Sequence, residues 1–213
     1  YINFIVTHIN EEPAIAPANN YTTVLGSAVL NDVVEVKGYI SAVSSQGPIL
    51  TDNGGSVLLY KTTGYEIGDE VTVNGTIASY NKGFQIGTTG LTIEKTGTTT
   101  VTYPTPVELT GAMADELLTS RVEDEYAQYV KISGTASVSG NYYNFNIDGA
   151  TTAVGSFYGL TDAQKAVITD GGHYTVYGYF VTISVYAGAP RYINFITVSI
   201  EESTAAASTF AAK

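Results

Sequence analysis

Residues 34–40 read Val-Glu-Val-Lys-Gly-Tyr-Ile, and residues 71–77 read Val-Thr-Val-Asn-Gly-Thr-Ile. The same pattern, apolar-x-apolar-x-Gly-x-apolar, returns at residues 130–136 and 174–180. Alternation with a period of two predicts a strand that buries one face. Each glycine falls on that inward face, where the missing side chain lets a strand bend sharply at a barrel corner. Four such strands in two pairs therefore predict two copies of one small barrel.

The segments around each pair supply the other strands. Turn signals at residues 52–55, 81–83 and 140–141 separate β-rich runs, as expected for hairpins. Thr161-x-x-Gln164 has the spacing of a capping box, which predicts a short helix that stops before residues 170–172. We therefore expect an all-β protein with minor α content. It has two five-stranded barrels in tandem, an extra N-terminal strand and one or two short helices.

Five strands, with a loop or helix between the third and fourth, describe the oligonucleotide/oligosaccharide-binding (OB) barrel. Residues 36–40 and 65–77, which include the run Ile-Gly-Asp-Glu-Val at 67–71, resemble tandem OB modules of secreted and surface proteins, notably bacterial ones. The resemblance covers about residues 30–202. The second half departs from it, because no Ile-Gly-Asp-Glu run precedes Tyr174.

The organisation that we expect has five parts. They are an N-terminal strand and linker at 1–20, a first barrel at 21–97, a Thr/Pro linker with a short helix at 98–127, a second barrel at 128–202 and an Ala-rich tail at 203–213. Within the linker, Leu109, Met113 and Leu117 recur at helical spacing and predict a packing face.

Composition narrows the class of protein. Of the 213 residues, 9 are Lys or Arg and 20 are Asp or Glu, so the net charge is −11. Such an acidic chain repels phosphate backbones. The absence of cysteine excludes disulfides, thiolate metal sites and cysteine nucleophiles, and no run approaches the ~18 apolar residues of a transmembrane helix. Low charge, and Tyr1 in place of an initiator Met, lead us to expect an exported, processed protein at the cell surface or outside the cell.

The two ends share a strand sequence. Tyr-Ile-Asn-Phe-Ile stands at residues 1–5 and again at 192–196, where it is the expected closing strand of the second barrel. The large side chains of the two copies are Tyr1, Ile2, Phe4, Ile5, Val6 and Ile9, and Tyr192, Ile193, Phe195, Ile196 and Ile200. The chain thus begins with a closing strand that lacks its own four partners, and an unpaired apolar strand readily templates pairing.

Two explanations of the N-terminal strand compete. Either it is the remnant of a longer array of barrels and docks on its own chain, or it enters a neighbouring subunit by β-strand addition. Head-to-tail contacts of the second kind propagate into a fibre unless they close. Our leading hypothesis is therefore a non-enzymatic, self-assembling surface filament whose partners are copies of the same chain.

No catalytic or metal-binding pattern stands out. The two histidines, His8 and His173, have no partner at a ligand spacing, and the acidic runs at 69–70 and 123–125 lack the oxygen-ligand pattern of a calcium loop. We therefore expect no enzyme activity, no metal and no cofactor.

The alternative hypothesis is a binding module. OB barrels bind ligands over their second and third strands, and aromatic residues there can stack on sugar rings or bases. The candidates for such a groove are Tyr60, Lys61, Tyr65, Tyr142, Tyr143 and Tyr158. Single-strand binders also need a basic track, and nine scattered cations do not form one. Oligosaccharides (glycans) are therefore favoured over single-stranded nucleic acid.

Overall fold

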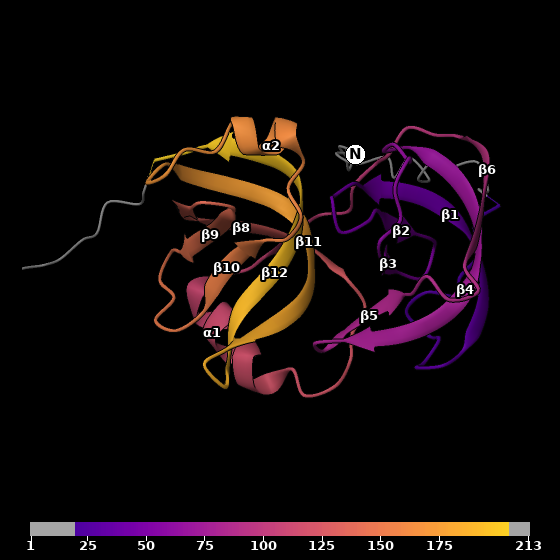
Figure 1. The fold of residues 1–213 in the computed structure, drawn as a ribbon, viewed down its shortest axis with the longest axis horizontal. Coiled ribbons are helices and arrows are strands. Elements are labelled where there is room, and N and C mark those ends of the chain that lie inside the picture. Colours follow the sequence, from indigo (N-terminus) through magenta and orange to yellow (C-terminus); the bar gives the residue numbers. More distant parts are fainter. Residues whose placement is uncertain (1–19, 205–213) are drawn as a thin grey trace, which may run out of the picture.

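The computed structural model describes residues 20–204, which form two closed five-stranded barrels side by side, each with one extra strand (Figure 1). Barrel 1 consists of β1 (Val33–Ala42), β2 (Ile49–Thr51), β3 (Ser56–Leu59), β4 (Asp69–Tyr80) and β5 (Gly83–Ile86), with β6 (Thr92–Thr98) outside it. Barrel 2 consists of β8 (Gln128–Ser139), β9 (Tyr142–Ile147), β10 (Val154–Phe157), β11 (His173–Tyr186) and β12 (Ala189–Glu202), with β7 (Val107–Glu108) outside it.

Both barrels have the same strand order. Barrel 1 runs β1-β2-β3-β5-β4 and closes through β1–β4, and barrel 2 runs β8-β9-β10-β12-β11 and closes through β11–β8. In each, the third and fifth strands pair in parallel. This topology is compatible with an OB-like fold and confirms the predicted pair of five-stranded barrels. The predicted N-terminal strand lies outside the described residues.

The repeated glycines occupy the inward face, as predicted. At Gly38 a Cβ atom would collide with the carbonyl oxygen of Thr51 on β2, and at Gly134 with that of Asn146 on β9. Only glycine lets the first and second strands approach this closely while the first strand bends around the barrel.

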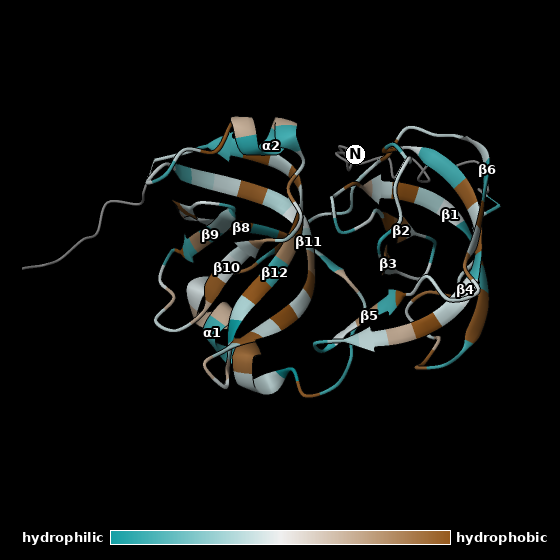
Figure 2. Ribbon diagram, in the orientation of Figure 1, coloured by the Kyte–Doolittle hydropathy of each residue, from teal (hydrophilic) through white to brown (hydrophobic). Residues whose placement is uncertain are grey.

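Each barrel has its own apolar core. Hydrophobic and hydrophilic bands alternate along β4, β11 and β12, as expected when one strand face turns inward (Figure 2). In barrel 2, Phe145, Phe157 and Phe195 meet edge to face, with ring centroids 5.1–6.0 Å apart. Because Phe195 belongs to the closing strand β12, that strand completes the core as well as the sheet.

Two details differ from the expectations. The last strand of barrel 1, β5, is followed by a loop at 87–91 and by the extra strand β6, which the sequence analysis did not anticipate. Helix α1 (Gly111–Ser120) begins only after its N-cap, Thr110, so Leu109 does not share the helical face predicted for it. Leu109 and Leu117 nevertheless pack in the core of barrel 2 as predicted, together with Ala114 and Leu118 of the helix, whereas Met113 is 40 % exposed. Helix α2 (Asp162–Ala166) has the predicted capping box.

The barrels share a third apolar cluster. The outer face of barrel 1 contributes Ala42, Ile49 and Leu58, which pack against Tyr179, Val181 and Ile196 on the outer face of barrel 2. Tyr103, from the segment that joins the barrels, stacks on Tyr129 at 5.0 Å and donates a hydrogen bond of 2.7 Å to the carbonyl oxygen of Ser41. The joining segment thus takes part in the contact between the barrels.

A buried arginine reinforces this contact. The Arg121 side chain, which lies 4.3 Å from the centroid of the Phe180 ring, donates hydrogen bonds to the carbonyl oxygens of Lys82, Glu125 and Val181 at 2.8, 3.2 and 3.3 Å. Since Lys82 belongs to barrel 1 and Val181 to barrel 2, one guanidinium links both barrels.

Candidate functional site

A cleft of about 550 Å³ opens on the outer face of barrel 2. Four strands build it, namely β9, β10, β12 and β11, together with the end of β8. Its lining has no charged side chain and consists of Ser139, Tyr142, Asn144, Ser156, Ser184, Val185, Tyr186, Tyr192 and Asn194. Three tyrosines among amides and hydroxyls give apolar ring surfaces next to hydrogen-bonding groups, the usual combination of a small-ligand site.

The floor of the cleft is a row of polar side chains on adjacent strands. Asn144 lies opposite Ser156, and Ser156 lies opposite Asn194. The Asn194 side chain, buried at the floor, uses its amide nitrogen to donate hydrogen bonds to the hydroxyls of Thr182, at 2.8 Å, and Ser184. These two bonds fix the orientation of the amide group. The neighbouring residues in each strand, such as Phe195, point into the core.

Tyr186 and Tyr192 form one side of the cleft, with ring centroids 6.2 Å apart and nearly perpendicular planes. Tyr186 lies at the end of β11 and Tyr192 near the start of β12, and a hairpin joins the two strands. In this hairpin Tyr186 pairs with Ala189 across the two-residue turn Ala187–Gly188. Both turn residues have positive φ angles, 50° and 87°, which is the turn geometry that suits the twist of two strands. The short hairpin therefore holds both rings at the cleft.

The equivalent row of barrel 1 has a different chemistry. There Ile49 lies opposite Leu58, and Leu58 lies opposite Gln85. Strand pairing places this row at the same position of the fold as Asn144, Ser156 and Asn194 of barrel 2. The Ile49 and Leu58 side chains are 0 % and 2 % exposed because barrel 2 covers them. One barrel thus uses this face for apolar docking, while the other leaves it open and polar.

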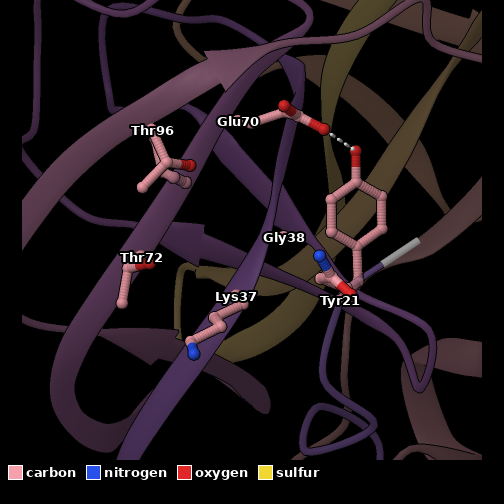
Figure 3. Close-up of a pocket in the computed structure, with 8 residues that line it drawn as sticks. Tyr21, Lys37, Gly38, Glu70, Thr72 and Thr96 are labelled. Atoms are coloured by element: carbon pink, nitrogen blue, oxygen red, sulfur yellow. Dashed lines mark hydrogen bonds between the residues drawn. The ribbon is translucent and has the colours of Figure 1, made fainter.

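Barrel 1 has a separate hollow of about 520 Å³ on the wall formed by β1, β4 and β6 (Figure 3). Lys37, Glu70, Thr72 and Thr96 line it. The Tyr21 hydroxyl donates a hydrogen bond of 2.7 Å to Glu70, and burial, reinforced by this carboxylate, raises the pKa of Tyr21 to about 12. In the hollow, the tyrosine hydroxyl and the carboxylate are therefore paired with each other.

The tyrosines predicted for a ligand groove are distributed over several places. Tyr142 lines the cleft and is 75 % exposed. Tyr143 packs against the core of barrel 2, and Tyr65 against the core of barrel 1. Tyr60 and Tyr158 join the apolar cluster between the barrels, where burial raises the pKa of Tyr158 to about 12. The Lys61 ammonium lies outside the cleft, 5.3 Å from the centroid of the Tyr60 ring.

Of the two copies of the duplicated strand, the structure describes the C-terminal one. Tyr1, Ile2, Phe4, Ile5, Val6 and Ile9 lie outside the described residues. In the C-terminal copy, β12 pairs with β10 on one side and β11 on the other. Ile193 and Phe195 enter the core, Ile196 enters the cluster between the barrels, and Ile200 packs at the margin of the core. Tyr192 and Asn194 line the cleft, a role that the sequence analysis missed.

One histidine has partners that the sequence did not indicate. The Nε2 atom of His173 lies 2.9 Å from a carboxylate oxygen of Asp148, and its Nδ1 atom lies 2.9 Å from the Ser203 hydroxyl. The Ser203 amide also donates to the carbonyl oxygen of His173. These contacts tie the chain after β12 to the start of β11.

Residues 20–204 contain no group of three or more His, Asp or Glu side chains that could hold a metal ion. Within the same span, neither α1 nor α2 has the length and apolar character that a membrane-crossing helix requires.

Comparison with known proteins gives no relative. No protein-family model, no curated protein and no solved structure matches the chain.

Proposed function

We propose that this protein is a carbohydrate-binding module and that the cleft of barrel 2 holds a short oligosaccharide. One observation carries the proposal. At equivalent positions, barrel 1 has Ile49 and Leu58 while barrel 2 has Asn144 and Ser156. The fully buried centre of an interface between protein domains is more apolar than the rest of the surface, and Ile49 and Leu58 of barrel 1 occupy such a centre. Amides and hydroxyls on an open face instead suit a ligand rich in hydroxyl groups.

Two further features support a sugar. The exposed Tyr142 and Tyr186 side chains offer ring surface on which a sugar ring can stack. The uncharged lining, in a chain of net charge −11, lacks the basic track that a nucleic-acid backbone needs. The resemblance to OB modules of secreted and surface bacterial proteins agrees with this role, and we place the protein outside the cell and assign it no enzymatic activity.

The test is a binding screen with substitutions at the cleft. Parent protein is applied to an oligosaccharide array, and affinities for the positive probes are then measured by calorimetry. We expect Tyr142→Ala and Asn144→Ile each to weaken binding tenfold or more. The matched control is Tyr80→Ala, since Tyr80 is also exposed but lies on barrel 1. An array without any positive probe, or cleft variants that bind like the parent, would refute the proposal. Salt-dependent binding of single-stranded oligonucleotides would instead identify nucleic acid, rather than a sugar, as the ligand.

A second candidate function, self-assembly by strand exchange, is favoured by the environment of β12. Its segment 192–196 is paired on both edges, and Ile193 and Phe195 are 0 % and 1 % exposed. The same five residues stand at positions 1–5, so they carry the side chains that fit between β10 and β11, the position that we call the β12 slot. We infer that the N-terminal copy could take the slot in a neighbouring subunit, which would join copies head to tail.

Strand exchange is tested by comparing the full chain with a variant that lacks residues 1–12, using light scattering after size-exclusion chromatography. Concentration-dependent oligomers that disappear in the deletion variant and in Phe4→Asp would support exchange. A monomeric full chain at high concentration would eliminate it. Oligomers that persist after the deletion would also contradict it, because they would need a different contact.

A further inference from the structure

Arg191 occupies an irregular position at the edge of the cleft. In the β11–β12 ladder, Ser184 pairs with Tyr192 but the next residue, Val185, pairs with Pro190. Arg191 is therefore an extra residue on β12, which makes this position a β-bulge. Bulges redirect a side chain that regular alternation would place on the other face, and they are frequent beside functional sites.

The bulge brings the Arg191 guanidinium to the cleft tyrosines. Its central carbon lies 5.4 Å from the ring centroid of Tyr186 and 6.0 Å from that of Tyr192. Without the bulge, consecutive residues such as Arg191 and Tyr192 would point to opposite faces of the strand. The contact with both rings stabilises the cation at the rim of the cleft.

The charge of Arg191 is available to a ligand. The side chain is exposed, and no carboxylate of residues 20–204 lies within 4 Å of it. The cleft lining itself is uncharged. A guanidinium presents several N–H donors in a planar fork that matches the two oxygens of a carboxylate.

We propose that Arg191 makes the cleft selective for acidic oligosaccharides, in which a carboxylate on one sugar unit binds the guanidinium. This inference rests on the proposed carbohydrate-binding function and names the class of sugar. Tyr142, Tyr186 and the polar floor bind the sugar ring and its hydroxyls, whereas Arg191 binds the carboxylate. The net charge of −11 repels such a ligand elsewhere on the protein, so a cation at the rim also sets the orientation of the bound sugar.

The experiment compares carboxylate-bearing probes with neutral counterparts. The probes are trigalacturonate, triguluronate and sialyllactose, and the counterparts are the two methyl esters and lactose. We expect the parent protein to bind at least one acidic probe tenfold more tightly than its counterpart. Arg191→Gln should lose that preference and keep its affinity for the neutral form. If Arg191 only held Tyr186 and Tyr192 in place, Arg191→Gln would also weaken the binding of neutral sugars. An unchanged affinity for the neutral sugars therefore shows that Arg191 contacts the carboxylate directly.

Two controls complete the design. Lys61→Gln removes one positive charge from another exposed side chain that lies over a tyrosine, so it changes net charge equally without touching the cleft. It should retain the preference of the parent. Equal affinity of parent and Arg191→Gln for every acidic probe, or an equal loss in Lys61→Gln, would overturn the role of Arg191. Binding of neutral sugars alone would also overturn it but leave the carbohydrate-binding function intact. The absence of binding to all probes and to the whole array would instead refute that function.

Discussion

Removing the Arg121 guanidinium should be the most informative test of the contact between the barrels. Arg121→Met retains much of the apolar stem but removes the donors to the carbonyl oxygens of Lys82, Glu125 and Val181. The hydrogen bond to Val181 is buried, and leaving a buried carbonyl oxygen without its charged donor costs about 1.5–3 kcal/mol. The exposed Glu125 carboxylate, 3.9 Å away, should add little.

The expected loss is measurable by urea unfolding followed by circular dichroism. With a denaturant dependence of about 2–3 kcal/mol/M, a loss of about 1.5–3 kcal/mol should lower the midpoint by roughly 0.5–1.5 M. Glu125→Gln is the matched control, because it removes the exposed ion pair and leaves the three carbonyl contacts, and it should change stability by less than about 0.5 kcal/mol. A midpoint for Arg121→Met close to that of the parent would refute the assignment of Arg121 as the link between the barrels.

Three further predictions concern the pH dependence and the core. The Asp115 carboxylate accepts hydrogen bonds from the backbone of residues 151–153 and from the Thr151 hydroxyl, which hold its pKa well below the usual range. The ionised Asp115 carboxylate therefore stabilises the fold above its usual pKa, and this stabilisation is lost as the pH falls. Between pH 5 and pH 2 the parent should lose more thermal stability than Asp115→Asn. Equal losses in the two proteins would contradict this. Burial raises the pKa of Tyr103 to about 12, so the neutral phenol stabilises the fold below about pH 10, and this stabilisation disappears as the pH rises through 12. Tyr103→Phe should remove one late-titrating phenol from the pH titration of the absorbance at 295 nm. A titration curve unchanged by the substitution would count against this assignment. Phe195→Ala should lower unfolding free energy by about 3–5 kcal/mol, whereas Val185→Ala, at an exposed position, should change it by less than about 0.5 kcal/mol; similar losses in both would disprove the central place of Phe195.

Much of the fold could be predicted because its signals are local. The alternation at residues 34–40 and 130–136 sets which side chains face inward, and Gly38 and Gly134 mark where the first strand of each barrel passes close to the second. The capping box at Thr161 fixes the start of α2 within four residues. Each of these signals depends on neighbours along the chain, which is why the sequence contains them.

The docking of the barrels was not visible in the same way. Ile49 and Leu58 looked like ordinary strand residues, and only the packing of barrel 2 explains their complete burial. Tyr60 and Tyr158, predicted to face a ligand, join the same cluster because the two barrels meet there.

By itself, the sequence determined two bent-strand barrels and the apolar character of their closing strands. The cleft was decided only by the tertiary structure. The parallel pairing of β10 with β12 places Ser156 beside Asn194, far along the chain, and a one-residue bulge turns Arg191 toward Tyr186 and Tyr192. Alternation specifies which face a side chain takes, but strand order and register specify its neighbours, and those depend on long-range pairing that no short segment encodes.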